Sequence, residues 1–210
     1  MDFDRQEGCQ PAATRRHFTR DATIFRQGDV ARGWYEVVEG IARVCQFRCD
    51  GRRQVLAFAV PGDVIGLEYG NRDACAESLT PMILSYHAFG GEHAHASAPW
   101  GRVVRDTHQC LALMGLPTAT ERLAGFILCM SKRLGNRAAF DLPMPRVDIA
   151  DHLGLTMHTV SRTLCDLARR GLIRIVAHHH FQVVAPDRLA EISGIDPREF
   201  DPPQPQQLVA

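Results

Sequence analysis

The segment from Arg146 to Ala168 constrains the fold most strongly, because it has the pattern of two short helices joined by a tight turn. Gly154 suits the left-handed conformation that ends a helix. Thr156 can cap the next helix, because its hydroxyl can accept a hydrogen bond from a free amide of the first turn. Leu155 is expected to be buried in the turn. Helical spacing predicts two core-facing rows: Val147, Ile149, Ala150 and Leu153, then Val160, Leu164 and Leu167.

Two helices in this arrangement describe a helix-turn-helix, whose second helix enters the DNA major groove. Base edges there present a readable pattern of hydrogen-bond donors and acceptors. The outward face predicts base contacts from His158, Thr159, Ser161 and Arg162. Phosphate contacts, which position the protein without reading sequence, are expected from Arg146, Thr156, Arg169 and Arg170. An ordinary helical hairpin is the alternative, but residues 171–184 look like a two-stranded wing and favour DNA binding.

This pattern resembles the winged helix of the CRP/FNR family of bacterial transcription regulators, and within it the FixK group. The resemblance rests on Leu-Pro-Met-Pro-Arg-Val-Asp-Ile-Ala-Asp-His-Leu-Gly-Leu-Thr at 142–156 and Thr-Val-Ser-Arg-Thr-Leu at 159–164. The family usually carries Glu where this chain has His158, which puts the usual base preference in doubt. The resemblance covers about residues 20–194. It implies a homodimer that binds near-palindromic DNA, engages RNA polymerase and activates genes of microaerobic respiration or nitrogen fixation.

The N-terminal half shows short strand patterns separated by glycine turns. These glycines recur at steps of 12, 11 and 11 residues, as expected for an antiparallel roll or barrel: Gly28, Gly40, Gly51 and Gly62. Residues 34–38 and 41–47 look like one hairpin, and Asp50-Gly51 is a tight turn before a strand at 55–60. Together with residues 50–54 and 58–68, this part resembles the cyclic-nucleotide-binding β-roll that opens CRP/FNR proteins.

The roll lacks the signature that family members use to bind a cyclic nucleotide. Those members carry Arg-Ser-Ala or Arg-Thr-Ala where this chain has Ala74-Cys75-Ala76. The arginine matters because a guanidinium can grip phosphate with two bonds. Arg72 lies close by and is a less favoured substitute. We therefore expect no bound nucleotide, and a ligand-, haem- or redox-gated regulator is the alternative.

Cysteine and histidine positions bear on metal cofactors. An iron–sulfur cluster needs about four neighbouring thiolates, and the oxygen-sensing relatives place three near the N-terminus. This chain has only Cys9 before Cys45, so no cluster is expected. Haem or metal binding remains a less favoured alternative for His87, His93 and His95, whereas a solvated or phosphate-contacting wing tip is favoured for His178, His179 and His180. No metal or other cofactor is predicted.

Residues 98–116 have a heptad-like apolar pattern. The resemblance makes this stretch a dimerisation helix, while plain core is the alternative. Its expected contacts are Trp100, Val103, Val104, Thr107, Cys110, Leu111 and Met114. Pro117 breaks the helix, and a capping box at 118–121 begins another at 119–134. That next helix should bury Leu123, Phe126, Ile127 and Met130.

The expected fold class is α+β, with a cyclic-nucleotide-binding-type β-roll at 1–97, a dimerisation helix at 98–116 and a winged helix-turn-helix at 117–194. Residues 195–210, rich in Pro and Gln, are expected to be disordered. The 210 residues have a formal net charge of zero, so attraction to DNA must come from a local field.

Several signals place the protein in the cytoplasm. No apolar run is long enough to span a bilayer, and the N-terminus lacks a signal pattern. The odd count of 7 scattered cysteines favours free thiols in a reducing compartment. No nucleophile-and-base signature or phosphate loop suggests an enzyme.

Cys165 follows Ser161 by one helical turn and is a candidate redox-sensitive position beside the DNA. Oxidation would add polar bulk and, as sulfinic acid, negative charge next to phosphate. An inert filler is the somewhat favoured alternative.

Overall fold

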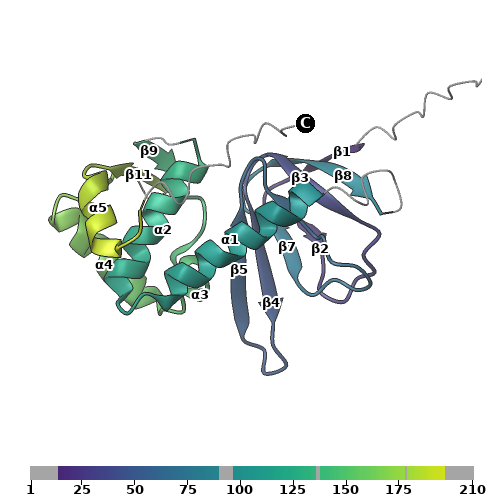
Figure 1. Cartoon of the computed structure of the whole chain (residues 1–210), viewed down its shortest axis with the longest axis horizontal. Coiled ribbons are helices and arrows are strands. Elements are labelled where there is room, and N and C mark those ends of the chain that lie inside the picture. Colours follow the sequence, from purple (N-terminus) through teal and green to yellow (C-terminus); the bar gives the residue numbers. More distant parts are fainter. Residues whose placement is uncertain (1–13, 90–96, 136–137, 178, 197–210) are drawn as a thin grey trace, which may run out of the picture.

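The computed structural model describes residues 14–89, 97–135, 138–177 and 179–196 (Figure 1). Strands form a roll, and a smaller helical part carries the C-terminal elements. The long helix α1 (Ser97–Gly115) crosses the roll diagonally and leads into the helical part (Figure 1). The expected residues His93, His95, His178 and Cys9, and the tail from 197 on, lie outside the described residues. Among the described residues, no helix combines the length and apolar character needed to cross a membrane.

The roll consists of two antiparallel sheets. The first has the order β1 (Thr14–Phe18), β8 (Met82–Ala88), β3 (Gly33–Glu39) and β6 (Val64–Ile65). The second has the order β2 (Thr23–Phe25), β7 (Cys75–Ser78), β4 (Ala42–Phe47) and β5 (Arg53–Ala59). Side chains of both sheets meet in the roll interior, among them Phe25, Val37, Ala76 and Leu84. The β-roll expected from the sequence is therefore confirmed.

The expected hairpin of residues 34–38 with 41–47 is wrong, although both strands exist. β3 pairs with β8 and β6, whereas β4 pairs with β5 and β7. Gly40 has a φ of 89°, and a Cβ there would lie 2.4 Å from the carbonyl oxygen of Pro81. The turn thus packs closely on the start of β8 and carries the chain from one sheet to the other. The hairpin is instead β4–β5, closed by the turn at Asp50-Gly51.

Helix α2 (Ala119–Arg133) forms the centre of the helical part. The hydroxyl of Thr118 accepts a hydrogen bond from the backbone N–H of Glu121, as expected for the cap. The four side chains expected to be buried on this helix are buried: Leu123, Phe126, Ile127 and Met130. The helix ends one residue before Leu134, which was the expected last residue.

The elements that the sequence predicts to bind DNA follow α2. They are β9 (Ala139–Asp141), α3 (Arg146–Leu153), α4 (Met157–Arg169), β10 (Ile173–Ile175), β11 (His180–Val183) and α5 (Pro186–Ser193). β10 and β11 form the expected wing, and β9 adds a third strand on the other side of β11. The sequence pattern did not predict β9.

The roll and the helical part share one hydrophobic cluster. Phe58 of β5 makes an edge contact with Phe126 of α2, with ring centroids 5.9 Å apart. Its ring also lies 5.1 Å from that of His152 in α3. Residues such as Ile41 and Leu79 of the roll belong to the same cluster as the core of the helix-turn-helix. The recognition elements are therefore packed against the roll.

Candidate nucleic-acid interface

The turn between α3 and α4 forms as the sequence predicts. Gly154 adopts a left-handed conformation with φ 64° and ψ 39°, and its N–H donates to the carbonyl of Ala150. Thr156 then caps α4, because its hydroxyl accepts a hydrogen bond from the N–H of Thr159 at 3.1 Å. The Thr156 side chain is thus occupied by the cap, which fixes where α4 begins.

The inward face of α4 buries Val160, Leu164 and Leu167, as expected. On α3 the expected pattern is partly wrong. Val147 is 42% exposed, whereas Asp148 beside it is 0% exposed. Asp148 is buried because arginines of the roll bind its carboxylate. Leu155 is only partly buried, at the edge of the shared cluster.

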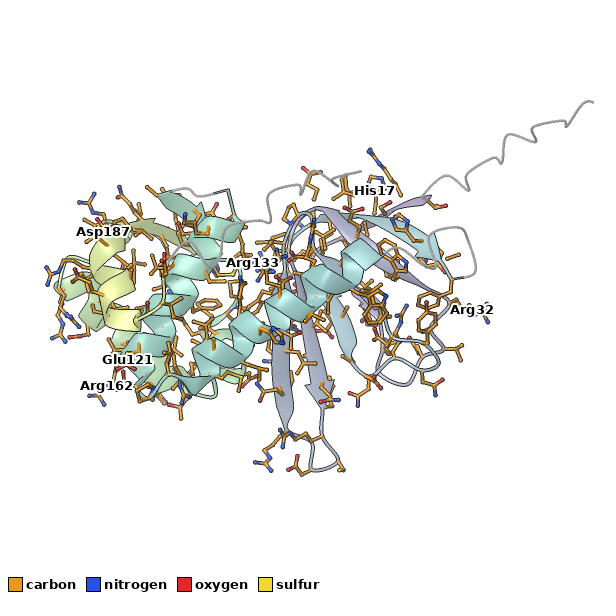
Figure 2. The ribbon with its side chains drawn as sticks, in the orientation of Figure 1. His17, Arg32, Glu121, Arg133, Arg162 and Asp187 are labelled. Atoms are coloured by element: carbon orange, nitrogen blue, oxygen red, sulfur yellow. The ribbon has the colours of Figure 1, made fainter. Side chains whose placement is uncertain are left out.

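The outward face of α4 presents the side chains expected to read bases. His158 and Arg162 are exposed, and Thr159 and Ser161 are half-buried between them and the core. Arg162 extends away from the body of the protein (Figure 2). Within the described ranges it forms no ion pair, so its five N–H donors are available to a ligand.

Two arginines at the C-terminal end of α4 share one carboxylate. Arg169 lies 3.0 Å and Arg170 lies 3.7 Å from Asp166. Such exposed ion pairs contribute only about 0–1 kcal/mol, so phosphate can replace Asp166 as the partner. Arg174 on β10 is also exposed near the wing, a basic residue that the sequence pattern did not single out.

Arg146 is half-buried, unlike the other arginines expected to contact phosphate. Its guanidinium lies over the ring of Phe181 in the wing, 4.9 Å from the centroid. Burial lowers the pKa of Arg146, and the nearby thiol of Cys165 opposes this effect. Arg146 therefore joins α3 to the wing in addition to any role toward DNA.

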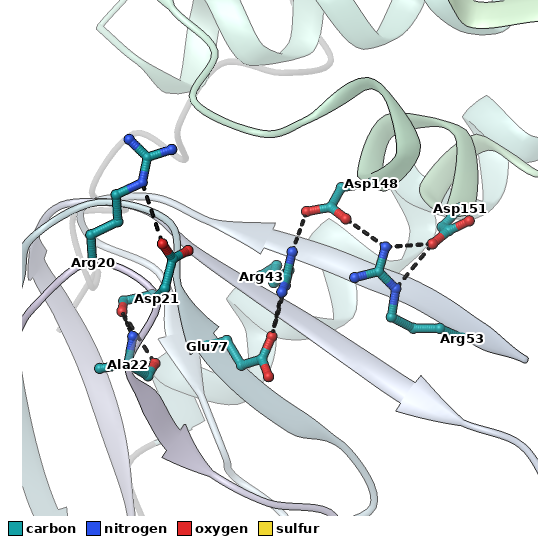
Figure 3. Close-up of polar contacts among 9 residues, drawn as sticks. Arg20, Asp21, Ala22, Arg43, Arg53, Glu77, Asp148 and Asp151 are labelled. Carbon is teal, nitrogen blue, oxygen red and sulfur yellow. Dashed lines mark hydrogen bonds and ion pairs between the residues drawn. The ribbon is translucent and has the colours of Figure 1, made fainter. Parts of the chain in front are cut away.

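An ion-pair network holds α3 on the roll (Figure 3). The carboxylate of Asp148 accepts from Arg43 at 2.6 Å and from Arg53 at 2.5 Å. Arg43 also donates to Glu77, and Arg53 to Asp151, each at 2.6 Å. Burial disfavours the charged form of Arg43, but the hydrogen bonds to Asp148 and Glu77 outweigh burial and raise its pKa. Arg43 and Asp148 are 105 residues apart in the sequence, and Arg53 and Asp151 are 98 residues apart, so no local pattern could reveal these contacts.

His152 is a second contact of α3 with the roll. Its Nδ1 lies 3.2 Å from the carbonyl oxygen of Val55, which requires the proton to be on Nδ1. Nε2 then faces the thiol of Cys110 in α1 at 4.0 Å. Burial lowers the pKa of His152 to about 4, so the imidazole is neutral near physiological pH.

Arg72 does not lie free for a phosphate in the roll. It is buried, and its guanidinium donates to the backbone carbonyls of Gly66 and Gly33 while lying 4.4 Å from the Phe25 ring centroid. A cavity of about 670 Å³ opens between the roll, α1 and α2. Ala74, which stands where nucleotide-binding members carry arginine, lies at its wall. Protein carbonyls therefore occupy the Arg72 donors that a phosphate would need.

The histidines and cysteines form no metal site among the described residues, where no group of three or more His, Cys, Asp or Glu could hold an ion. His87 stacks on Trp34 with ring centroids 3.9 Å apart. In the wing, His180 pairs with Asp141 at 2.7 Å, and His179 contacts the carbonyl of Leu142.

The apolar pattern of α1 divides into two rows. Val103, Cys110 and Met114 are half-buried and line the cavity beside the roll. The other expected contacts are exposed, although all of them except Val104 also border this cavity: Trp100, Val104, Thr107 and Leu111. Leu111 is 60% exposed and Val104 is 49% exposed, so an apolar row remains uncovered in a single chain.

Comparisons with known proteins agree with these features. The model of the Crp-like helix-turn-helix domain matches residues 121–192, and that of the cyclic nucleotide-binding domain matches residues 15–84. The nitrogen fixation regulation protein FixK of Bradyrhizobium diazoefficiens is 33% identical over 201 residues, which cover 85% of this chain and 81% of that protein. The transcriptional activatory protein AadR of Rhodopseudomonas palustris is 33% identical over 200 residues, with coverage of 85% and 76%.

Among solved structures, FixK2 from Bradyrhizobium japonicum superposes with a TM-score of 0.78 at 32% identity, covering 88% of this chain and 98% of that one. The matched relatives are transcription regulators rather than enzymes, and the match includes both the roll and the helix-turn-helix. The chain belongs to the CRP/FNR family of DNA-binding transcription regulators and is similar to its FixK group.

Proposed function

We propose that this chain is a cytoplasmic homodimeric activator that binds near-palindromic DNA and recruits RNA polymerase to genes used at low oxygen. The observation that carries the proposal is the outward face of α4, where Arg162 and His158 are exposed on a helix fixed at its start by Thr156. Relatives named for nitrogen fixation regulation and for transcriptional activation support the physiological part.

Base reading is assigned to four residues of α4. Arg162 donates two hydrogen bonds to guanine O6 and N7, a contact that discriminates by about 1–3 kcal/mol. Ser161 and Thr159 reach a neighbouring base or phosphate, and His158 faces one further base pair. The phosphate contacts are Arg146, Thr156, Arg169 and Arg170. Thr156 contributes through its backbone, because the cap uses its hydroxyl.

Dimerisation is assigned to α1. The exposed row of Trp100, Val104, Thr107 and Leu111 has the spacing of a coiled-coil seam, and its burial against a second copy would remove apolar surface from water. A two-fold axis along α1 then places two copies of α4 in half-sites about 34–36 Å apart.

We infer that the roll acts without a bound nucleotide. Arg72 is the cation closest in the sequence to Ala74-Cys75-Ala76, and its guanidinium is bound to Gly66, Gly33 and the Phe25 ring. A phosphate would have to displace these contacts. The second candidate is control by an uncharged ligand, favoured by the cavity between the roll and α1. Extraction and mass spectrometry of small molecules from the purified protein would separate the two.

Selection from random duplex DNA tests the proposal. The native protein should select a near-palindrome, and Arg162→Ala should lose preference at one symmetric pair of positions. Arg188→Ala is the matched control, because Arg188 is exposed on α5, outside the recognition helix. Equal weakening on every sequence would make Arg162 a phosphate contact, and no selected site at all would overturn DNA binding.

Leu111→Asp tests the dimer seam, because it places a charge in the apolar row. The variant should sediment as a monomer and bind the full site poorly. Val30→Asp is the control, because Val30 is 67% exposed on the roll, far from α1 in the sequence. A normal Leu111→Asp dimer would place the seam elsewhere.

A further inference from the structure

Two cysteines lie opposite each other on neighbouring strands of the second sheet of the roll. In the register of β4 with β7, Cys45 lies opposite Cys75, and Arg43 lies opposite Glu77. Directly opposed residues project to the same side of an antiparallel pair. The Arg43–Glu77 contact at 2.6 Å shows that side chains on this side reach across the strands. Cys45 and Cys75 also belong to the same buried cluster.

We propose that Cys45 and Cys75 form a dithiol site that a hydroperoxide converts reversibly into a cross-strand disulfide. Opposed Cβ atoms in antiparallel strands lie about 4.5–5.5 Å apart, and a disulfide needs about 3.5–4.5 Å. The strands therefore have to approach by only about 1 Å.

The surroundings of the two thiols set the order of the chemistry. Cys75 is 9% exposed and lines a surface hollow with Thr23, Arg26 and Gln27. The backbone N–H of Gln27 donates to its sulfur at 3.2 Å. Cys45 is 0% exposed, and burial raises its pKa to about 11, so it remains a protonated thiol. The oxidant reaches Cys75 first.

The reaction balances in two steps. The Cys75 thiolate attacks one oxygen of hydrogen peroxide, the O–O bond breaks, and with one proton the products are the sulfenic acid and water. The Cys45 sulfur then attacks the sulfenic sulfur, its proton leaves with the hydroxyl as a second water, and the S–S bond forms. Two thiols are oxidised by two electrons and one peroxide is reduced.

The site adjoins the contact between roll and helix-turn-helix. Cys45 lies two residues after Arg43, and Cys75 lies two residues before Glu77, on the same side of the sheet. Arg43 is the residue that binds Asp148 of α3. A disulfide that draws β4 toward β7 therefore acts on the strand positions that hold α3.

Peptide mapping of the intact protein tests the proposal. Trypsin cleaves after Arg43, Arg48 and Arg72, so Cys45, Cys49 and Cys75 fall in separate peptides, residues 44–48, 49–52 and 73–102. After hydrogen peroxide and alkylation, peptide 44–48 should be linked to peptide 73–102, with loss of both alkylatable thiols. Dithiothreitol should restore both.

Two variants sharpen the result. Cys49→Ser removes the exposed neighbour and should keep the link. Cys45→Ala should leave Cys75 as a sulfenic acid that dimedone traps. The proposal is overturned if peptide 49–52 replaces peptide 44–48 in the link, if Cys75 is oxidised while Cys45 stays alkylatable, or if both thiols survive peroxide.

Discussion

The substitution Asp148→Asn removes the charge at the centre of the contact between α3 and the roll. The Asp148 carboxylate is fully buried and accepts from Arg43 and Arg53. Asn has nearly the same shape, but one of its two terminal atoms becomes an NH₂ group that faces a guanidinium donor. The substitution thus leaves one of the two half-buried arginines without its acceptor and facing an NH₂ group, and it removes the negative charge without creating a cavity.

The expected cost follows from what the arginines retain. Removing one partner of a buried ion pair costs about 3–5 kcal/mol. Arg43 keeps Glu77 and Arg53 keeps Asp151, which favours the lower end, about 3 kcal/mol. For a chain of this size, that corresponds to a melting temperature lower by about 6–12 °C.

Urea titration and thermal melting, both followed by circular dichroism, measure this change. Asp50→Asn is the matched control, because Asp50 pairs with Arg52 at the exposed tip of the β4–β5 hairpin. The unfolding midpoint of this variant should equal that of the native protein. Combining Asp148→Asn with Arg43→Met should cost less than the sum of the two single changes, because both remove one contact. A loss below about 1 kcal/mol for Asp148→Asn would refute the reasoning, since that is the range of exposed pairs.

Three further expectations concern pH, oxidation and base preference. Burial lowers the pKa of His152 to about 4, so as the pH falls below about 6.5, the ordinary pKa of histidine, the unfolded chain binds the proton before the folded chain does. The free energy of unfolding should therefore fall by about 3 kcal/mol between about pH 6.5 and 4. His152→Asn should flatten this slope in urea titrations at several pH values. Peroxide should abolish DNA binding in a Cys49→Ser, Cys75→Ala background but spare its Cys165→Ser derivative, and equal sensitivity would remove the exposed Cys165 from consideration. His158→Glu should change the base selected at one symmetric pair of positions, because a carboxylate accepts from the cytosine amino group whereas an imidazole cannot fully copy that role; identical sites from both proteins would sink this role.

The helix-turn-helix was predictable because its signals are local. Gly154 supplies the left-handed turn and Thr156 supplies the cap, each acting within a few residues. The apolar positions of α4 follow the helical period, and that helix packs only inward. The glycine spacing of the roll was equally informative, because turns depend on backbone conformation at single residues.

The errors arose where a residue depends on distant partners. A glycine at Gly40 signals a turn, but whether the following strand pairs back or enters another sheet depends on contacts with Pro81 and β8. The dimer contacts predicted along α1 remain a prediction, but the helical period alone could not reveal that three of them, Val103, Cys110 and Met114, are half-buried beside the roll. A charged residue such as Asp148 is assigned to solvent unless its cations are known.

Helix α3 links the roll to the DNA-binding helix α4, whose outward face does not contact the roll. With about 100° of rotation per residue, Asp148, Asp151 and His152 form one face of α3, and all three contact the roll. Ile149 and Leu153 lie on a second face, within the core that includes α4. Val147 falls between these two faces and is exposed for that reason. A change in β4 or β5 can therefore reach α4 through α3, which Arg43 and Arg53 bind, and through α2, whose Phe126 contacts Phe58 of β5.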